Sequence, residues 1–257
     1  MSDRKRSIIN SIWRLLVLYA VFCLIVFLVQ RSLLYFPSHE EPVSALSPWL
    51  VEGNVVGYCR EVPNPKNVWL MLHGNAGQAS DRDYALGRLE KSDSLYVLEY
   101  PGYGQRPGSP NRVSFDSAAL DAYEWLATRF PTTPLCVIGE SIGSGPASGL
   151  ASASRTPDRI VLVVPYDKLS AVAGRRFFFL PVSWMLLDNW DNIHSLQNYQ
   201  GPVDIFGARD DHVIPCSHAK NLAQQIPQAN FHEIPCGHND WWRMPKVKIR
   251  HEPESAR

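Results

Sequence analysis

The stretch Gly139-Glu140-Ser141-Ile142-Gly143 places a serine between two glycines directly after an apolar run. That run, residues 135–138, is predicted to be a buried strand, and residues 142–153, which are rich in small side chains, a helix. A strand, a G-x-S-x-G turn and a helix together expose a serine hydroxyl at the edge of a sheet. Side chains at either glycine of the strained turn would collide with the neighbouring strand and helix. The turn also leaves the N–H of Ile142 at a helix N-terminus, where negative charge is favoured. Ser141 is therefore the candidate nucleophile.

A serine hydroxyl becomes an effective nucleophile when a histidine takes its proton and a carboxylate holds that histidine in one tautomer. In a strand–turn–helix architecture of this kind, the acid and then the histidine follow the serine along the chain. Two loops fit this order, residues 207–215 and residues 235–240, and each follows a predicted strand. Polar residues just past the carboxyl ends of strands are where α/β folds build their sites. His238, in the second loop, is the candidate base.

The first of these loops offers two adjacent acids, Asp210 and Asp211, whose side chains must point apart. Asp211 is the preferred acid because it leaves two residues before Ile214-Pro215. Asp210 remains the alternative. The carboxylate that does not contact the histidine is expected to accept hydrogen bonds from local backbone N–H groups.

The reaction also needs a second N–H group to stabilise a developing oxyanion. Residues 67–72 are predicted to be a strand, and His73-Gly74-Asn75-Ala76-Gly77 the turn that follows it. A turn at this place contributes one backbone donor in such folds. The predicted oxyanion donors are the backbone N–H groups of Asn75 and Ile142.

Taken together, these motifs resemble the membrane-anchored α/β-hydrolase-domain serine hydrolases, which include small bacterial members and eukaryotic lipid or protein-acyl hydrolases. The resemblance spans most of residues 33–242. The matching segments are Leu33-Leu34-Tyr35-Phe36-Pro37, His73-Gly74-Asn75-Ala76-Gly77, Tyr100-Pro101-Gly102-Tyr103-Gly104, the stretch around Ser141, Leu180-Pro181-Val182, Asp211 with Ile214-Pro215, and Gly237-His238-Asn239-Asp240. The resemblance implies the triad Ser141, Asp211 and His238. The acid loop is one residue longer than usual when counted from Gly207, which keeps Asp210 open.

The expected fold is α/β: an α/β-hydrolase fold with a mostly parallel central sheet flanked by helices, in a catalytic domain at residues 37–250. Strands and helices alternate along the chain, as right-handed crossovers require. The alternation lapses at about residues 167–200, where this fold places a small cap after its sixth strand. The aromatic cap could form an apolar wall for an acyl chain near a bilayer, or a helix with its aromatics in the core. Phe178 and Trp184 in the cap, and Tyr103 on the rim, are the candidate substrate-pocket residues.

An uncharged N-terminal run predicts a membrane anchor. Residues 15–30 carry no charge, which as a helix is about 24 Å and a little short for a bilayer. Extension to residues 12–36 gives ample length, with Arg14 and Arg31 able to snorkel. We therefore expect an N-terminal segment at residues 1–11 and a signal-anchor at 12–36. A removed signal peptide is the alternative, but no small-x-small cleavage site follows the run.

Basic residues are concentrated before this span: Arg4, Lys5, Arg6 and Arg14 outweigh the single Arg31 just after it. The positive-inside rule then places the N-terminus in the cytoplasm and the catalytic domain on the other side, which is the periplasmic side in a bacterium.

The bulk composition excludes some function classes. The 257 residues include 25 acidic and 25 basic side chains without a long basic tract, which argues against a nucleic-acid partner. The five cysteines lack zinc-ligand spacing, so no metal is predicted, and the triad requires no cofactor. Cys216 and Cys236 could pair in an oxidising compartment. The polar end of the chain from Lys246, and residues 251–257 in particular, is expected to be flexible.

The sequence thus predicts a membrane-tethered serine hydrolase that cleaves carboxylic ester or thioester bonds of small-molecule or lipid acyl substrates. Amide or peptide cleavage on the same triad is one alternative. A catalytically idle, membrane-bound binding module is the other, although such a module needs no nucleophile, acid and base in this order.

Overall fold

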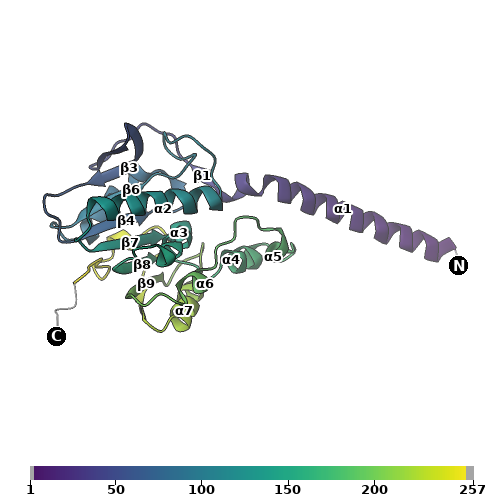
Figure 1. Ribbon diagram of the computed structural model, residues 1–257. Helices are drawn as coiled ribbons and strands as arrows, with labels where there is room; N and C mark the ends of the chain where they lie inside the picture. The colour runs from purple at the N-terminus through teal and green to yellow at the C-terminus, as the bar shows by residue number, and fades with distance from the viewer. Residues whose placement is uncertain (1–2, 253–257) are drawn as a thin grey trace.

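The computed structural model describes residues 3–252 and consists of one long helix followed by an α/β domain (Figure 1). The helix, α1 (Asp3–Leu34), extends away from the domain. Among the described residues, α1 is the one helix long and apolar enough to cross a membrane, over Arg6–Leu34. It covers nearly all of the predicted anchor at residues 12–36.

The domain is built on an eight-stranded sheet of order β10-β9-β8-β7-β4-β6-β3-β2. Only β2–β3 and β3–β6 pair antiparallel; the other neighbours are parallel. The strands are β2 (Ser47–Val51), β3 (Asn54–Arg60), β4 (Val68–Leu72), β6 (Ser94–Leu98), β7 (Leu135–Glu140), β8 (Arg159–Val163), β9 (Val203–Ala208) and β10 (Ala229–Ile234). This topology confirms the predicted α/β-hydrolase fold with its mostly parallel sheet. A separate two-residue pair, β1 (Phe36–Pro37) with β5 (Ala76–Gly77), joins the end of α1 to the turn after β4.

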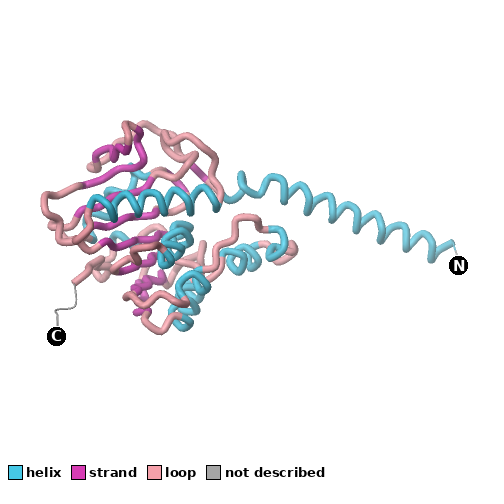
Figure 2. The backbone as a smooth tube through the Cα atoms, in the orientation of Figure 1, coloured by secondary structure: helices cyan, strands magenta, loops and turns pink. Residues whose placement is uncertain are grey.

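α-Helices cover one face of the sheet, and 3₁₀ turns and the end of the chain cover the other. Figure 2 shows the helices beside the strands. The helices of the domain are α2 (Arg112–Arg129), α3 (Ser144–Gly149), α4 (Leu169–Arg176), α5 (Val182–Met185), α6 (Asn192–Leu196) and α7 (Cys216–Gln225), with 3₁₀ turns η1 (Ala79–Arg88), η2 (Ser141–Gly143), η3 (Leu150–Ser152) and η4 (Trp241–Arg243). The helix expected at residues 142–153 is therefore three short segments, η2, α3 and η3.

The central strands are buried on both faces, which explains their unbroken apolar sequence. In β4, Leu70 belongs to the core that includes Phe115 and Tyr123 of α2. Met71, on the opposite face, packs in a second core with Trp241 and Ile249. Both layers meet at β4 and β7, the strands whose carboxyl ends carry the predicted oxyanion turn and Ser141.

The cap is anchored to α1 and leaves its aromatics at residues 177–184 exposed. Helices α4 and α5 project from the domain on the same side as α1 (Figure 1). Phe178 is 85% exposed and Trp184 is 91% exposed. The interpretation that places the cap aromatics in the core is therefore wrong for the aromatics of residues 177–184, because this part of the cap packs against α1 instead of against the sheet. It holds for Trp190 and Tyr199, which are buried in the core.

The polar end of the chain is more ordered than its composition predicts. Val247 and Ile249 are buried, and the Ile249 N–H donates to the Arg88 carbonyl at 3.0 Å. The carbonyl of His251 accepts from Asn67 Nδ2 at 3.1 Å. Fraying from Lys246 is thus wrong as far as His251, because two alternate apolar side chains reach the second core. The rest of the predicted tail, residues 253–257, lies outside the described residues.

All five cysteines are free thiols in the structure, so Cys216 and Cys236 do not form the disulfide that their positions allowed.

Candidate active site

Ser141 occupies a strained turn between β7 and η2, with a φ of 53°. A Cβ atom at Gly139 would lie 2.6 Å from the Ala147 Cβ of α3. At Gly143 it would lie 2.1 Å from the Leu72 carbonyl oxygen of β4. Both glycines are therefore required for the close approach of helix and strand that the sequence predicted, and the turn presents the Ser141 hydroxyl to the adjacent cavity.

The structure brings together the three residues expected to form a triad. His238 Nε2 lies 2.9 Å from Ser141 Oγ, and His238 Nδ1 lies 2.6 Å from Asp211 Oδ2. The other carboxylate oxygen of Asp211 accepts the backbone N–H groups of Val213 and Ile214, each at 2.8 Å. These bonds fix the buried carboxylate. With its proton on Nδ1, the imidazole leaves Nε2 free to accept the serine proton.

Asp210, the alternative acid, points away from this group. Its side chain is 58% exposed and lies 3.6 Å from Arg209 Nε. The acid loop turns so that only the second of the two aspartates reaches His238.

The two predicted oxyanion donors, Asn75 and Ile142, line the same cavity as Ser141. Hydrogen bonds hold the side chain of Asn75. Its Nδ2 donates to the Leu34 carbonyl at the end of α1 at 2.5 Å, and its Oδ1 accepts from Tyr103 Oη at 2.9 Å. The turn that carries the Asn75 N–H is therefore tied directly to the end of the long helix.

The cavity beside Ser141 has a volume of about 510 Å³. Its walls come from the end of α1, the turn after β4, helix α4 and the loop of His238. None of the three predicted pocket residues lines it. Tyr103 is buried in the core, where it supports Asn75, and Phe178 and Trp184 project from the surface of the cap. The cavity is lined instead by the inner side of α4, through Leu169 and Val172.

No family model matches the chain, but individual proteins do. The uncharacterised protein Rv2307c of Mycobacterium tuberculosis is 30% identical over 229 residues, which cover 82% of this chain and 81% of that protein. The lysophosphatidylserine lipase ABHD12 of Danio rerio is 30% identical over 190 residues, covering 65% of this chain. This chain spans 50% of the length of that lipase.

Solved structures share the fold. The esterase Pf2001 of Pyrococcus furiosus superposes with a TM-score of 0.58 at 16% identity, over 80% of this chain and 90% of that one. Est1E of Butyrivibrio proteoclasticus gives a TM-score of 0.59 at 13% identity, over 72% of this chain and 90% of that one. The chain belongs to the α/β-hydrolase-domain family of serine hydrolases.

One residue of the hydrolase site that the sequence reasoning missed is Glu140, directly before Ser141. Its buried carboxylate accepts from the Gly74 N–H at 3.0 Å, Tyr84 Oη at 2.9 Å and Trp241 Nε1 at 2.7 Å. Burial alone would raise the pKa of this carboxyl, but the charge of Arg82 and these hydrogen bonds hold the pKa below its usual value. Glu140 thus ties the turn after β4 to the end of β7. An acid at the end of an otherwise apolar strand was the available signal.

Within residues 3–252, no three His, Cys, Asp or Glu side chains gather as a metal site would require.

Proposed function

We propose that this protein is a membrane-tethered hydrolase that cleaves carboxylic ester or thioester bonds through an acyl-enzyme. The observation that carries the proposal is the continuous hydrogen-bonded series from Asp211 through His238 to Ser141, which ends in a cavity of about 510 Å³. The relatives support an ester bond as the target. A lipase is 30% identical to part of this chain, and an esterase has the same fold.

In the proposed first step, Ser141 Oγ attacks the carbonyl carbon of the substrate while His238 Nε2 takes the hydroxyl proton. Asp211 keeps the imidazole oriented and stabilises its positive charge. The carbonyl oxygen becomes an oxyanion that accepts hydrogen bonds from the backbone N–H groups of Asn75 and Ile142. Losing one such donor typically raises the barrier by about 3 kcal/mol.

The tetrahedral intermediate then collapses. The bond between the carbonyl carbon and the leaving group breaks, and His238 gives its proton to the departing alcohol or thiol. A water molecule next attacks the acyl group on Ser141 and transfers its proton to the same imidazole. Release of the carboxylic acid returns the proton to Ser141 Oγ, so the enzyme ends the cycle unchanged.

The tether is α1. The basic side chains of Arg4, Arg6 and Arg14 before the apolar run outweigh Arg31 after it. The proposed orientation therefore has the N-terminus in the cytoplasm and the catalytic domain on the opposite side of the membrane.

The test combines active-site labelling with turnover. Detergent-solubilised wild type should react with a fluorophosphonate probe and hydrolyse p-nitrophenyl butyrate, and Ser141→Ala should do neither. Ser154→Ala, which removes an exposed hydroxyl elsewhere on the domain, is the matched control and should behave as wild type. Labelling that persists in Ser141→Ala would refute the assignment. Faster hydrolysis of a p-nitroanilide than of the matching p-nitrophenyl ester would favour amide cleavage on the same residues.

A further inference from the structure

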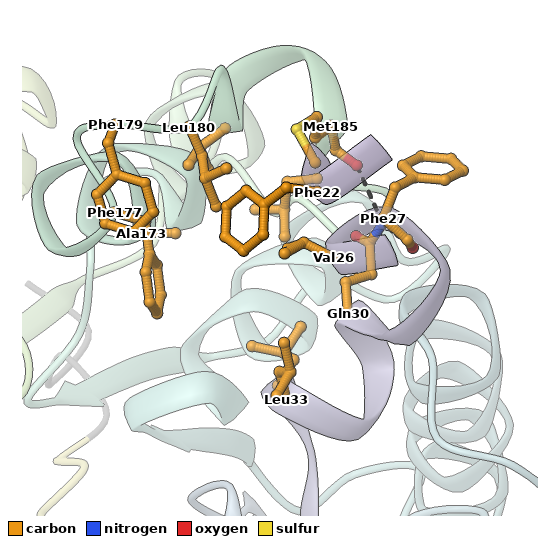
Figure 3. Close-up of a pocket in the computed structure, with 13 residues that line it drawn as sticks. Phe22, Val26, Phe27, Gln30, Leu33, Ala173, Phe177, Phe179, Leu180 and Met185 are labelled. Carbon is orange, nitrogen blue, oxygen red and sulfur yellow. Dashed lines mark hydrogen bonds between the residues drawn. The ribbon is translucent and has the colours of Figure 1, made fainter. Parts of the chain in front are cut away.

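A second cavity, of about 200 Å³, lies between α1 and the cap (Figure 3). One wall consists of α1 side chains between Phe22 and Leu34, and the other consists of cap side chains between Ala173 and Leu186. Figure 3 shows the rings of Phe22, Phe177 and Phe179 and the aliphatic chains beside them gathered around this groove. Except for Gln30, every side chain in its lining is apolar.

Polar contacts hold the two walls together. Gln30 Nε2 donates to the Met185 carbonyl at 3.1 Å, and Gln30 Oε1 accepts the Leu187 N–H at 2.9 Å. Tyr19 Oη donates to the Phe179 carbonyl at 2.7 Å. The one polar side chain in the lining is thus hydrogen-bonded to backbone groups of the cap and, through the Phe27 carbonyl, of α1, which leaves the groove suited to an apolar occupant.

The groove adjoins the cavity of Ser141. Leu34, the last residue of α1, lines both cavities. On the cap side, Val172 of α4 lines the cavity of Ser141, and its neighbour Ala173 lines the groove. Apolar side chains at the end of α1 and along α4 therefore separate the two cavities by little more than one residue on each side.

The groove lies along the part of α1 that is proposed to cross the membrane. Its lining on α1 runs from Phe22 to Leu34, about 18 Å of helix. This part of α1 belongs to the proposed membrane span, so the groove opens beside the half of the bilayer nearest the domain. The exposed Phe178 and Trp184 of the cap would there contact lipid instead of water. Arg175 and Arg176, at the end of α4, are exposed and long enough to reach lipid headgroups.

We propose that this groove binds the acyl chain of an ester that resides in the bilayer, while its carbonyl lies at Ser141. The proposal rests on the ester hydrolysis proposed above and names its substrate class: amphiphilic long-chain acyl esters that enter from the membrane. The volume of about 200 Å³ exceeds the roughly 150 Å³ of an apolar cavity that holds benzene, so several methylene groups fit. The remainder of a longer chain would stay among the lipids.

The experiment uses the full chain in phosphatidylcholine vesicles and measures the ratio of kcat/KM for p-nitrophenyl palmitate to that for p-nitrophenyl butyrate. Ala173→Trp fills the groove from the cap, and Val26→Trp fills it from α1. The matched control is Phe178→Trp, which introduces the same side chain on the exposed side of the cap. Fluorophosphonate labelling reports that each variant has a folded site.

Both groove variants should lower the palmitate-to-butyrate ratio at least tenfold, which corresponds to about 1.4 kcal/mol. The control should keep the ratio within twofold. A ratio that stays within twofold of wild type in either labelled groove variant would overturn the proposal. So would a wild type that hydrolyses butyrate but not palmitate, and in both cases the proposed ester hydrolysis would stand. A folded wild type that hydrolyses neither ester would remove both proposals.

Discussion

Replacing Glu140 by alanine tests whether the buried carboxylate beside Ser141 holds the site together. The substitution leaves the N–H of Gly74, the hydroxyl of Tyr84 and the indole N–H of Trp241 without their shared acceptor. It also removes the negative charge that faces Arg82, whose Nε lies 4.0 Å from the carboxylate. The variant therefore loses several hydrogen bonds to one charged group at once.

The magnitude follows from burial. Each hydrogen bond to a charged group contributes about 1.5–3 kcal/mol, but bonds that share an acceptor are not additive. Removing one member of a buried charged group typically costs about 3–5 kcal/mol, which we expect for Glu140→Ala. For a domain of this size, 1 kcal/mol lowers Tm by about 2–4 °C, so Tm should fall by about 6–20 °C.

The assay is thermal unfolding of the solubilised protein, followed by tryptophan fluorescence, for which Trp241 is a probe beside the substitution. Glu124→Ala, which removes an exposed glutamate from α2, is the matched control and should shift Tm by no more than about 2 °C. If Glu140→Ala unfolds within about 2 °C of that control, the carboxylate does not stabilise the site and the reasoning is wrong.

Two further predictions concern the choice between Asp211 and Asp210 and the pH dependence of the Glu140 contribution. Asp211→Asn should lower kcat for p-nitrophenyl butyrate by about 10⁴-fold, because the amide favours the wrong tautomer of the histidine, whereas Asp210→Asn should stay within about threefold; equal losses in the two variants would contradict the assignment. The pKa of Glu140 is lowered by folding, so its stabilisation is present above the ordinary glutamate pKa of about 4.3 and is lost as pH falls through the lower, folded pKa. The Tm difference between wild type and Glu140→Gln should accordingly be constant near neutral pH and shrink below about pH 4, and a difference that grows on acidification would show that the sign is wrong.

The fold and the order of the proposed triad could be predicted because each depends on local chemistry. A serine at positive φ needs glycines on both sides, and buried parallel strands need unbroken apolar runs. The choice between Asp210 and Asp211 could not be settled in this way. It depends on the turn of one loop, in which the Val213 and Ile214 N–H groups capture a single carboxylate oxygen.

Glu140 was missed for a different reason. A charged residue beside the nucleophile looks unremarkable in sequence, because exposed acids are common at strand ends. Its partners Tyr84 and Trp241 lie 56 and 101 residues away along the chain, and only the packed domain brings them together. The acid at the end of an apolar strand was visible in the sequence, but its hydrogen-bond partners were not.

The apolar composition of the cap predicts that it packs against another apolar surface, but it does not indicate which element of the fold provides that surface. The run around Phe178 is rich in aromatic side chains, yet it belongs to neither core of the domain. This run lies beside α1 instead, where the Tyr19 hydroxyl donates a hydrogen bond to the Phe179 carbonyl. The same helix ends at Leu34, whose carbonyl binds the Asn75 side chain within the proposed oxyanion turn. The long helix therefore has a structural role besides that of the proposed tether: its last turns form one wall of the apolar groove and hold the turn that the proposed chemistry requires.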